Sequence, residues 1–189
     1  MRYTVILLVA AILLLGGFYF FGGDDVDTEA PVVVTTFEEC VAAGNPVMES
    51  YPRQCRSEDG ELFVENIGNV LEKNDLIQLH SPTPNQMIES PLEITGEARG
   101  YWFFEASFPV TLTNWDGLII AEHYATADGD WMTEDFVPFA STLEFESPYK
   151  EGDPDFFKRG TLILQKDNPS GLPEHDDALE IPVTFAPAQ

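Results

Sequence analysis

The sequence predicts an all-β protein: a seven-stranded antiparallel immunoglobulin-like sandwich, preceded by an N-terminal transmembrane helix and a small disulfide-stapled helix-hairpin module. From about residue 75 onward, apolar residues recur at every second position in short runs, which is the period of a strand with one buried face. Turns rich in Gly, Pro and Asp separate the runs. Seven short alternating strands in about 110 residues are typical of a two-sheet sandwich.

We expect the sandwich to occupy residues 75–187. Its strands are expected at residues 76–79, 92–96, 102–112, 118–124, 137–145, 161–166 and 179–185. In the third strand, alternate residues from Trp102 to Leu112 share one face, and Phe103 and Pro109 lie on the other. Pro109 and Pro182 cannot donate a ladder hydrogen bond, so each is expected at an edge or a bulge.

The N-terminal 23 residues predict a membrane anchor. The 21 residues from Tyr3 to Gly23 carry no charge, and at about 1.5 Å per residue a helix of this length spans roughly 30 Å, the core of a bilayer. Arg2 precedes this run and Asp24 follows it, which predicts a cytoplasmic N-terminus and an extracytoplasmic C-terminal domain. A cleaved secretory signal is the alternative, although Phe21 fits a cleavage site after Gly23 poorly.

Charge excludes one class of partner. The chain has 33 acidic and 9 basic residues, and only Arg2 of these precedes residue 24. So acidic a domain repels a phosphate backbone, which predicts no binding to nucleic acid and no polybasic contact with anionic lipid. The charge is typical of a well-solvated surface that repels its own copies.

A linker at residues 24–36 and a two-cysteine module at residues 37–68 are expected between the anchor and the sandwich. Thr36 is a good helix N-cap, and Gly44 is suited to the end of a helix of about two turns. Asp59 and Gly60 predict the turn of a hairpin.

Cys40 and Cys55 are the only cysteines of the chain. In an exported protein such a pair predicts one disulfide, which stabilises a segment too short to build a core of its own. Redox or metal chemistry is disfavoured because the pair lacks the CxxC spacing and has no nearby histidine.

Several short blocks of the main domain carry a family resemblance. They are Ser81-Pro82-Thr83-Pro84-Asn85, residues 88–100, residues 102–106, Asp116-Gly117, Trp131-Met132, Pro138-Phe139, residues 160–162 and Pro182-Val183. Together they resemble the immunoglobulin-like domain of bacterial spore germination, also called the second Germane-associated domain, over about residues 76 to 186. The resemblance implies an exported sandwich, often attached to an anchor, with an interaction role and no catalytic residues to transfer.

Catalytic and metal-binding patterns are weak in this sequence. Ser170, His175 and Asp177 supply the residue types of a hydrolase triad but lie within one short loop and lack a nucleophile elbow. We therefore expect no enzymatic activity and no required cofactor. Acidic loops could hold Ca²⁺, with solvated turns as the alternative. The Ca²⁺ candidates are Asp128, Asp130, Asp153, Asp155, Asp176 and Asp177.

Aromatic residues are the remaining candidates for a binding surface. Tyr101 and Phe103 alternate with core positions and are expected to face outward, and Trp115 and Trp131 lie near turns. The alternative is that these rings pack beneath a neighbouring loop or the cysteine module. Exposed rings would suit a partner protein or a glycan.

These observations predict a membrane-anchored extracytoplasmic interaction or structural protein of the cell envelope, without enzymatic activity. Its partners would be the membrane, through the N-terminal helix, and an envelope protein or wall polymer. The alternative is a ligand-binding module that recognises cell-wall glycan or Ca²⁺ through exposed aromatic residues and acidic loops.

Overall fold

The computed structural model of the protein describes residues 33–188. The predicted anchor at residues 1–23 and the predicted linker as far as residue 32 lie outside the described residues. Within residues 33–188, no helix combines the length and apolar character needed to cross a membrane. From Thr36 onward the chain makes one compact unit, which holds both the cysteine module and the sandwich.

The cysteine module has the predicted helix and hairpin, with one further strand. It consists of α2 (Phe37–Ala42), β1 (Val47–Met48), β2 (Gln54–Arg56) and β3 (Leu62–Val64), and its strands form an antiparallel sheet in the order β1-β2-β3. The Thr36 hydroxyl accepts a hydrogen bond from the Glu39 backbone amide at 3.2 Å, as expected of an N-cap. Gly44, at φ 79°, follows the helix C-cap, and Gly60, at φ 85°, closes the β2–β3 turn.

The main sheet has eight strands. They are β4 (Ile77–Ser81), β5 (Met87–Ile88), β6 (Leu92–Arg99), β7 (Ser107–Asn114), β8 (Ile119–Ala127), β9 (Phe136–Leu143), β10 (Arg159–Gln165) and β11 (Ala178–Phe185). Their order is β4-β6-β9-β8-β7-β10-β11-β5, and every pair is antiparallel except β11 with β5. The short helices α3 (Val70–Lys73), η1 (Gly100–Trp102), η2 (Asp155–Lys158) and η3 (Pro173–His175) lie in the connections.

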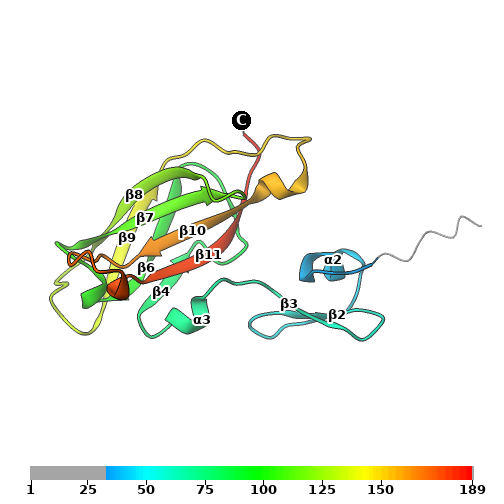
Figure 1. The fold of residues 1–189 in the computed structure, drawn as a ribbon, viewed down its shortest axis with the longest axis horizontal. Coiled ribbons are helices and arrows are strands. Elements are labelled where there is room, and N and C mark those ends of the chain that lie inside the picture. Colours follow the sequence, from blue (N-terminus) through cyan, green and yellow to red (C-terminus); the bar gives the residue numbers. More distant parts are fainter. Residues whose placement is uncertain (1–32, 189) are drawn as a thin grey trace, which may run out of the picture. The chain divides into compact units, whose positions relative to one another are not determined.

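The sheet doubles back on itself at the junction of β8 and β9. These strands pair only through Thr126 with Ala140 and Ala127 with Phe139. The strands β4, β6 and β9 therefore form one layer, and β8, β7, β10, β11 and β5 form the other (Figure 1). The arrangement agrees with the predicted sandwich class, although the prediction of seven strands, all antiparallel, was wrong. The missed strand β5 has two residues and pairs in parallel with β11, too short for any periodicity to reveal.

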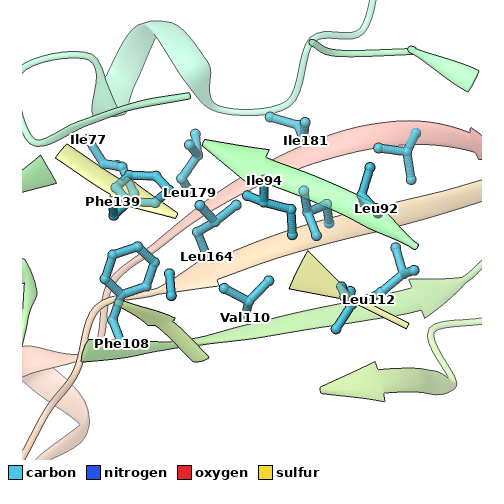
Figure 2. Packing of buried hydrophobic residues seen from close by; sticks show 14 of the residues in the cluster. Ile77, Leu92, Ile94, Phe108, Val110, Leu112, Phe139, Leu164, Leu179 and Ile181 are labelled. Atoms are coloured by element: carbon cyan, nitrogen blue, oxygen red, sulfur yellow. The ribbon is translucent and has the colours of Figure 1, made fainter. Parts of the chain in front are cut away.

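The core fills the space between the two layers (Figure 2). Alternate residues of each strand point inward; in β6 these include Leu92, Ile94 and Ala98, all buried. The ring of Phe108 in β7 meets the ring of Phe139 in β9 edge-to-face, with centroids 4.9 Å apart, so the layers are in direct contact. Burying each large apolar side chain contributes about 1.5–3 kcal/mol, which makes this cluster the main source of stability.

The predicted strand at residues 102–112 was wrong in its first half. Gly100–Trp102 forms a 3-10 turn, and Glu105 and Ala106 have φ angles of 50° and 64°. Such angles are rare for residues with a Cβ atom and break the alternation of faces. The strand begins only at Ser107, and Phe104, expected on the buried face, is exposed.

The expectation that Pro109 and Pro182 lie on an edge strand or at a bulge was wrong. Pro109 is paired with Tyr124 of β8, one residue beyond the last pairing of β7 with β10. Pro182 is paired with Thr161 of β10, on a part of β11 that β5 does not reach. Each proline therefore has a strand partner on one side only, which makes its missing N–H tolerable.

Candidate functional site

The loops of the sandwich gather at its two ends. β7 begins at Ser107 opposite Thr126 and ends at Asn114 opposite Gly160. Loops 100–106, 128–135 and 166–177 therefore share one end, called end A, and loops 115–118 and 144–158 share the other, called end B. Any site built from loops must lie at one of these ends.

The predicted aromatic surface is divided between them. Tyr101, which is 50% exposed, and the half-buried Trp131 lie at end A, whereas Trp115, which is 44% exposed, lies at end B. The expectation that Phe103 faces outward was wrong, because it follows the 3-10 turn and is only 3% exposed. Its ring lies 5.2 Å from that of Phe108. The four predicted residues do not form one surface.

At end B, a rigid turn presents Trp115. The Asn114 side-chain oxygen accepts hydrogen bonds from the backbone amides of Asp116 at 3.0 Å and Leu118 at 2.9 Å. The Asn114 backbone amide donates to the Leu118 backbone carbonyl. Gly117, at φ 77°, completes the turn. The Asn-Trp-Asp-Gly sequence therefore fixes the backbone around one exposed indole.

Two phenylalanines of η2 support this indole. The Trp115 ring meets Phe156 at 4.7 Å and Phe157 at 5.6 Å between centroids, both edge-to-face. Phe157 also packs against the core cluster. Sequence reasoning missed both phenylalanines, since they lie outside any strand period. We call the surface made by Trp115, Leu118, Ile119 and Phe156 the aromatic tip.

Carboxylates lie in the same loops as the aromatic tip. Asp116 lies in the turn itself, Asp153 precedes η2, and Asp155 is the first residue of η2. The Lys158 ammonium lies 2.7 Å from an Asp155 carboxylate oxygen, and that hydrogen bond lowers the pKa of Asp155 and raises the pKa of Lys158. Lys158 is therefore already paired, and the loops of end B hold six acidic residues against two lysines.

The candidate Ca²⁺ ligands are spread over both ends. Asp153 and Asp155 lie at end B, and the other four lie at end A. Several are already engaged: Asp153 accepts from the Lys150 amide, Asp176 from the Asn168 side chain, and Asp177 pairs with Lys73. Among the described residues, no three acidic, histidine or cysteine side chains gather in a way that could hold a metal ion. Ca²⁺ binding stays a prediction without a defined site.

Ser170 and His175 lie together at end A, but the arrangement differs from a catalytic triad. The Ser170 hydroxyl oxygen is 3.0 Å from His175 Nδ1 and 2.5 Å from an Asn168 side-chain oxygen. Asp177 pairs with Lys73 and accepts from the Ala178 amide instead of orienting the histidine. Both Ser170 and His175 are exposed. These contacts close a surface loop.

A concave region lies between the cysteine module and the sandwich. It has a volume of about 500 Å³, and Ile67, Leu79 and Ile181 contribute apolar lining. Arg53 and Glu65 also line this region, and Arg53 donates hydrogen bonds to the Glu65 carboxylate from Nε at 2.9 Å and from Nη2 at 2.6 Å. The hydrogen bond from Arg53 holds the pKa of the Glu65 carboxyl below its ordinary value, although burial acts in the opposite direction.

Asn85 joins this ion pair to the sandwich. Its side-chain amide donates to Glu65 at 3.2 Å and to the Asn66 carbonyl at 2.8 Å, while its backbone amide donates to Pro182. Asn85 adopts φ 64°, a conformation that asparagine tolerates better than most residues. The junction is therefore held by polar contacts that no sequence period could reveal.

The sandwich resembles a known family of domains. The family model of the immunoglobulin-like domain of bacterial spore germination matches residues 76–155. Residues 76–155 are therefore similar to a spore-germination immunoglobulin-like domain. No curated protein and no solved structure matched the chain.

The match confirms the resemblance seen in the sequence and can be placed on the fold. It covers β4 to β9 and the loop that leads to η2, and it ends before β10 and β11, which complete the second layer. The Trp115 turn of the aromatic tip lies inside the matched part of the spore-germination immunoglobulin-like domain, and Phe156 lies one residue beyond it.

Proposed function

We propose that the protein is a non-enzymatic interaction or structural module of the cell envelope. In this proposal the N-terminal apolar segment anchors it in the membrane, and the immunoglobulin-like sandwich of residues 75–187 stands on the extracytoplasmic side. The observation that carries the proposal is the match of residues 76–155 to an immunoglobulin-like domain, a class of domain that commonly serves cell-surface recognition.

Two further features support an extracytoplasmic location. The uncharged run from Tyr3 to Gly23 is long enough to span a bilayer and has its basic residue on the N-terminal side. Cys40 and Cys55 are both fully buried and joined in a disulfide across 15 residues. Structural disulfides persist mainly in oxidising compartments.

The arrangement of the polar side chains favours a role without catalysis. The Ser170–His175 pair lies on an exposed loop, and Asp177, the acid of the residue types named above, pairs with Lys73. A nucleophilic serine also needs an oriented base and a stabilised oxyanion. We therefore expect a serine-directed fluorophosphonate probe to leave the protein unlabelled, and labelling abolished by Ser170→Ala would contradict this part of the proposal.

The second candidate is recognition of cell-wall glycan. The exposed faces of Trp115 and Tyr101 favour it, because aromatic rings offer an apolar surface with little entropy to lose on binding. They lie at opposite ends of the sandwich, so a single glycan site would use only one of them. Ca²⁺ binding, the other form of this alternative, has no comparable support from the geometry.

The proposed function is tested by determining on which side of the membrane the sandwich lies. Cells that produce the full chain are treated with protease before and after permeabilisation, and the products are compared with a known cytoplasmic protein. We expect digestion of the sandwich in intact, wall-stripped cells and retention of the undigested chain in the membrane fraction after alkaline washing. Protection of the sandwich until permeabilisation would place it in the cytoplasm and overturn the proposal.

A further inference from the structure

We propose that the aromatic tip is the docking surface of the domain, and that it takes a cationic amphipathic segment of a partner protein. The inference rests on the proposed interaction function and specifies where and with what chemistry the domain binds. The surface consists of Trp115, Leu118, Ile119 and Phe156.

The apolar residues of the tip are exposed without serving the core. Leu118 is 65% exposed, Ile119 is 51% exposed and Trp115 is 44% exposed, and the three lie within five residues, in the β7–β8 turn and the first position of β8. Single exposed apolar residues are common, whereas a contiguous group marks an interaction site. End A also exposes large apolar side chains, namely Tyr101, Phe104, Met132 and Leu172, but these come from three separate loops, whereas Trp115, Leu118 and Ile119 lie within five residues of one another.

The tip is organised before any partner arrives. Asn114 fixes the backbone of the turn through four hydrogen bonds, and the rings of Phe156 and Phe157 both contact the indole edge-to-face. A partner that covers Trp115 therefore restricts few additional rotamers. Tryptophan in a rigid setting of this kind is the residue type most often found to dominate binding energy.

The negative charge of end B indicates which kind of partner the tip can bind. Asp116, Asp153 and Asp155 lie in the same loops as the tip, and Lys158 is paired with Asp155. A second copy of the chain would bring the same negative charge, since the protein carries 33 acidic and 9 basic residues. An anionic bilayer surface would be repelled for the same reason. Lysine or arginine side chains placed beside apolar ones match both properties of the tip.

The test uses the full chain in nanodiscs of zwitterionic lipid, labelled with fluorotryptophan. The chain has three tryptophans, so fluorine NMR reports separately on the buried Trp102, on Trp131 at end A and on Trp115 at the tip. The probe is a short amphipathic peptide of leucine and lysine at physiological salt. We expect the Trp115 resonance to shift on titration while the other two stay in place.

Variants locate the site. Leu118→Ser is expected to weaken peptide binding about tenfold, as removal of one central apolar contact does. Asp116→Asn is expected to weaken it less and to reduce its dependence on salt. The matched control is Tyr101→Ala, which removes an equally exposed aromatic ring at end A and is expected to change the affinity less than about twofold.

Three outcomes would overturn the inference. One is a peptide that shifts Trp131 and leaves Trp115 unmoved, and another is equal binding by a peptide with glutamate in place of lysine. The third is a muropeptide that shifts Trp115 when the lysine peptide does not, which would assign the tip to glycan. If the peptide does not bind the tip but protease still digests the sandwich from outside the cell, the proposed function is supported and only the assignment of the tip is wrong.

Discussion

Arg53 and Glu65 form a two-point ion pair in which the carboxylate is far more buried than the guanidinium. The Glu65 side chain is 8% exposed and the Arg53 side chain is 45% exposed. Arg53 also lies over the Phe37 ring, at 5.4 Å from its centroid. The pair therefore links the helix of the cysteine module to the segment that enters the sandwich, and its two members should not be equally costly to remove.

A double-mutant cycle measures this asymmetry. Arg53→Met leaves a nearly buried carboxylate with only Asn85 as a side-chain donor and should lower the free energy of unfolding by about 2–3 kcal/mol. Glu65→Gln leaves a half-exposed guanidinium that water solvates, and should lower it by about 1 kcal/mol. The double variant should lose less than the sum of the two. Equal single losses that add in full would show that the pair contributes no coupling.

Acid should weaken the protein partly through Glu65. Because the folded-state pKa of Glu65 lies below its ordinary value of 4.5, its contribution is fully present above that value and is lost as pH falls through the lowered pKa. Burial raises the pKa of Asp167, so that group acts in the opposite direction and gains stability on acidification. Denaturant titrations at a series of pH values below 4.5 measure this effect. The free energy of unfolding should fall less with acidification in Glu65→Gln and more in Asp167→Asn than in the wild type. A steeper loss in Glu65→Gln would contradict the assignment.

The disulfide should stabilise the cysteine module locally. Replacing Cys40 and Cys55 by serine releases a 15-residue loop, and loops of this size are stabilised by about 3 kcal/mol when closed. Hydrogen exchange should accelerate in α2, β2 and β3 and stay unchanged in β7 and β10, since the sandwich has its own core. Chemically reduced wild-type protein serves as the matched control. Loss of protection throughout the sandwich would show that the two parts unfold as one.

Gly68 should resist substitution for a reason that Gly117 lacks. Both have a positive φ angle, 70° at Gly68 and 77° at Gly117. A Cβ atom on Gly68 would lie 1.9 Å from the Glu180 carbonyl oxygen, whereas one on Gly117 would meet open space. Gly117→Ala should lower the free energy of unfolding by about 1 kcal/mol from backbone strain alone, and Gly68→Ala by about 3 kcal/mol or more. Equal losses in thermal or denaturant unfolding would contradict the close approach at β11.

Calcium should leave the melting temperature unchanged. The six candidate carboxylates lie at opposite ends of the sandwich, and Asp153, Asp176 and Asp177 already accept local hydrogen bonds or pair with lysine. A bound ion would stabilise the folded state in proportion to its saturation. A rise in melting temperature with millimolar Ca²⁺ that Asp153→Asn or Asp128→Asn abolishes would identify a site that this arrangement does not suggest.

Much of the fold followed from the period of two. The strands β6, β7, β9, β10 and β11 carry alternating buried residues, and burial against a second layer forces that alternation, whereas β8 does not show it. The same reasoning failed at Phe103 and Phe104, because Glu105 and Ala106 turn the chain through positive φ angles that non-glycine residues seldom adopt. Nothing in the residue types at those positions indicates such a turn.

The candidate surface was only partly predictable. Trp115 was a candidate because it lies near a turn, with packing beneath a neighbouring loop as the alternative. Its supports Phe156 and Phe157 come from a connection more than 40 residues later in the chain, and only the tertiary fold brings them beside it. The contact between Asn85 and Glu65 could not be predicted for the same reason, since it depends on how the cysteine module meets the sandwich.

Photo-crosslinking in intact cells tests the central claim most directly. A photoreactive residue replaces Trp115 in the full chain and, in a parallel strain, Tyr101 as the equally exposed control at end A. An extracytoplasmic interaction module that binds through its tip should give a discrete adduct in the envelope fraction from position 115 and none from position 101. No adduct from either position, or adducts with cytoplasmic proteins, would contradict the account.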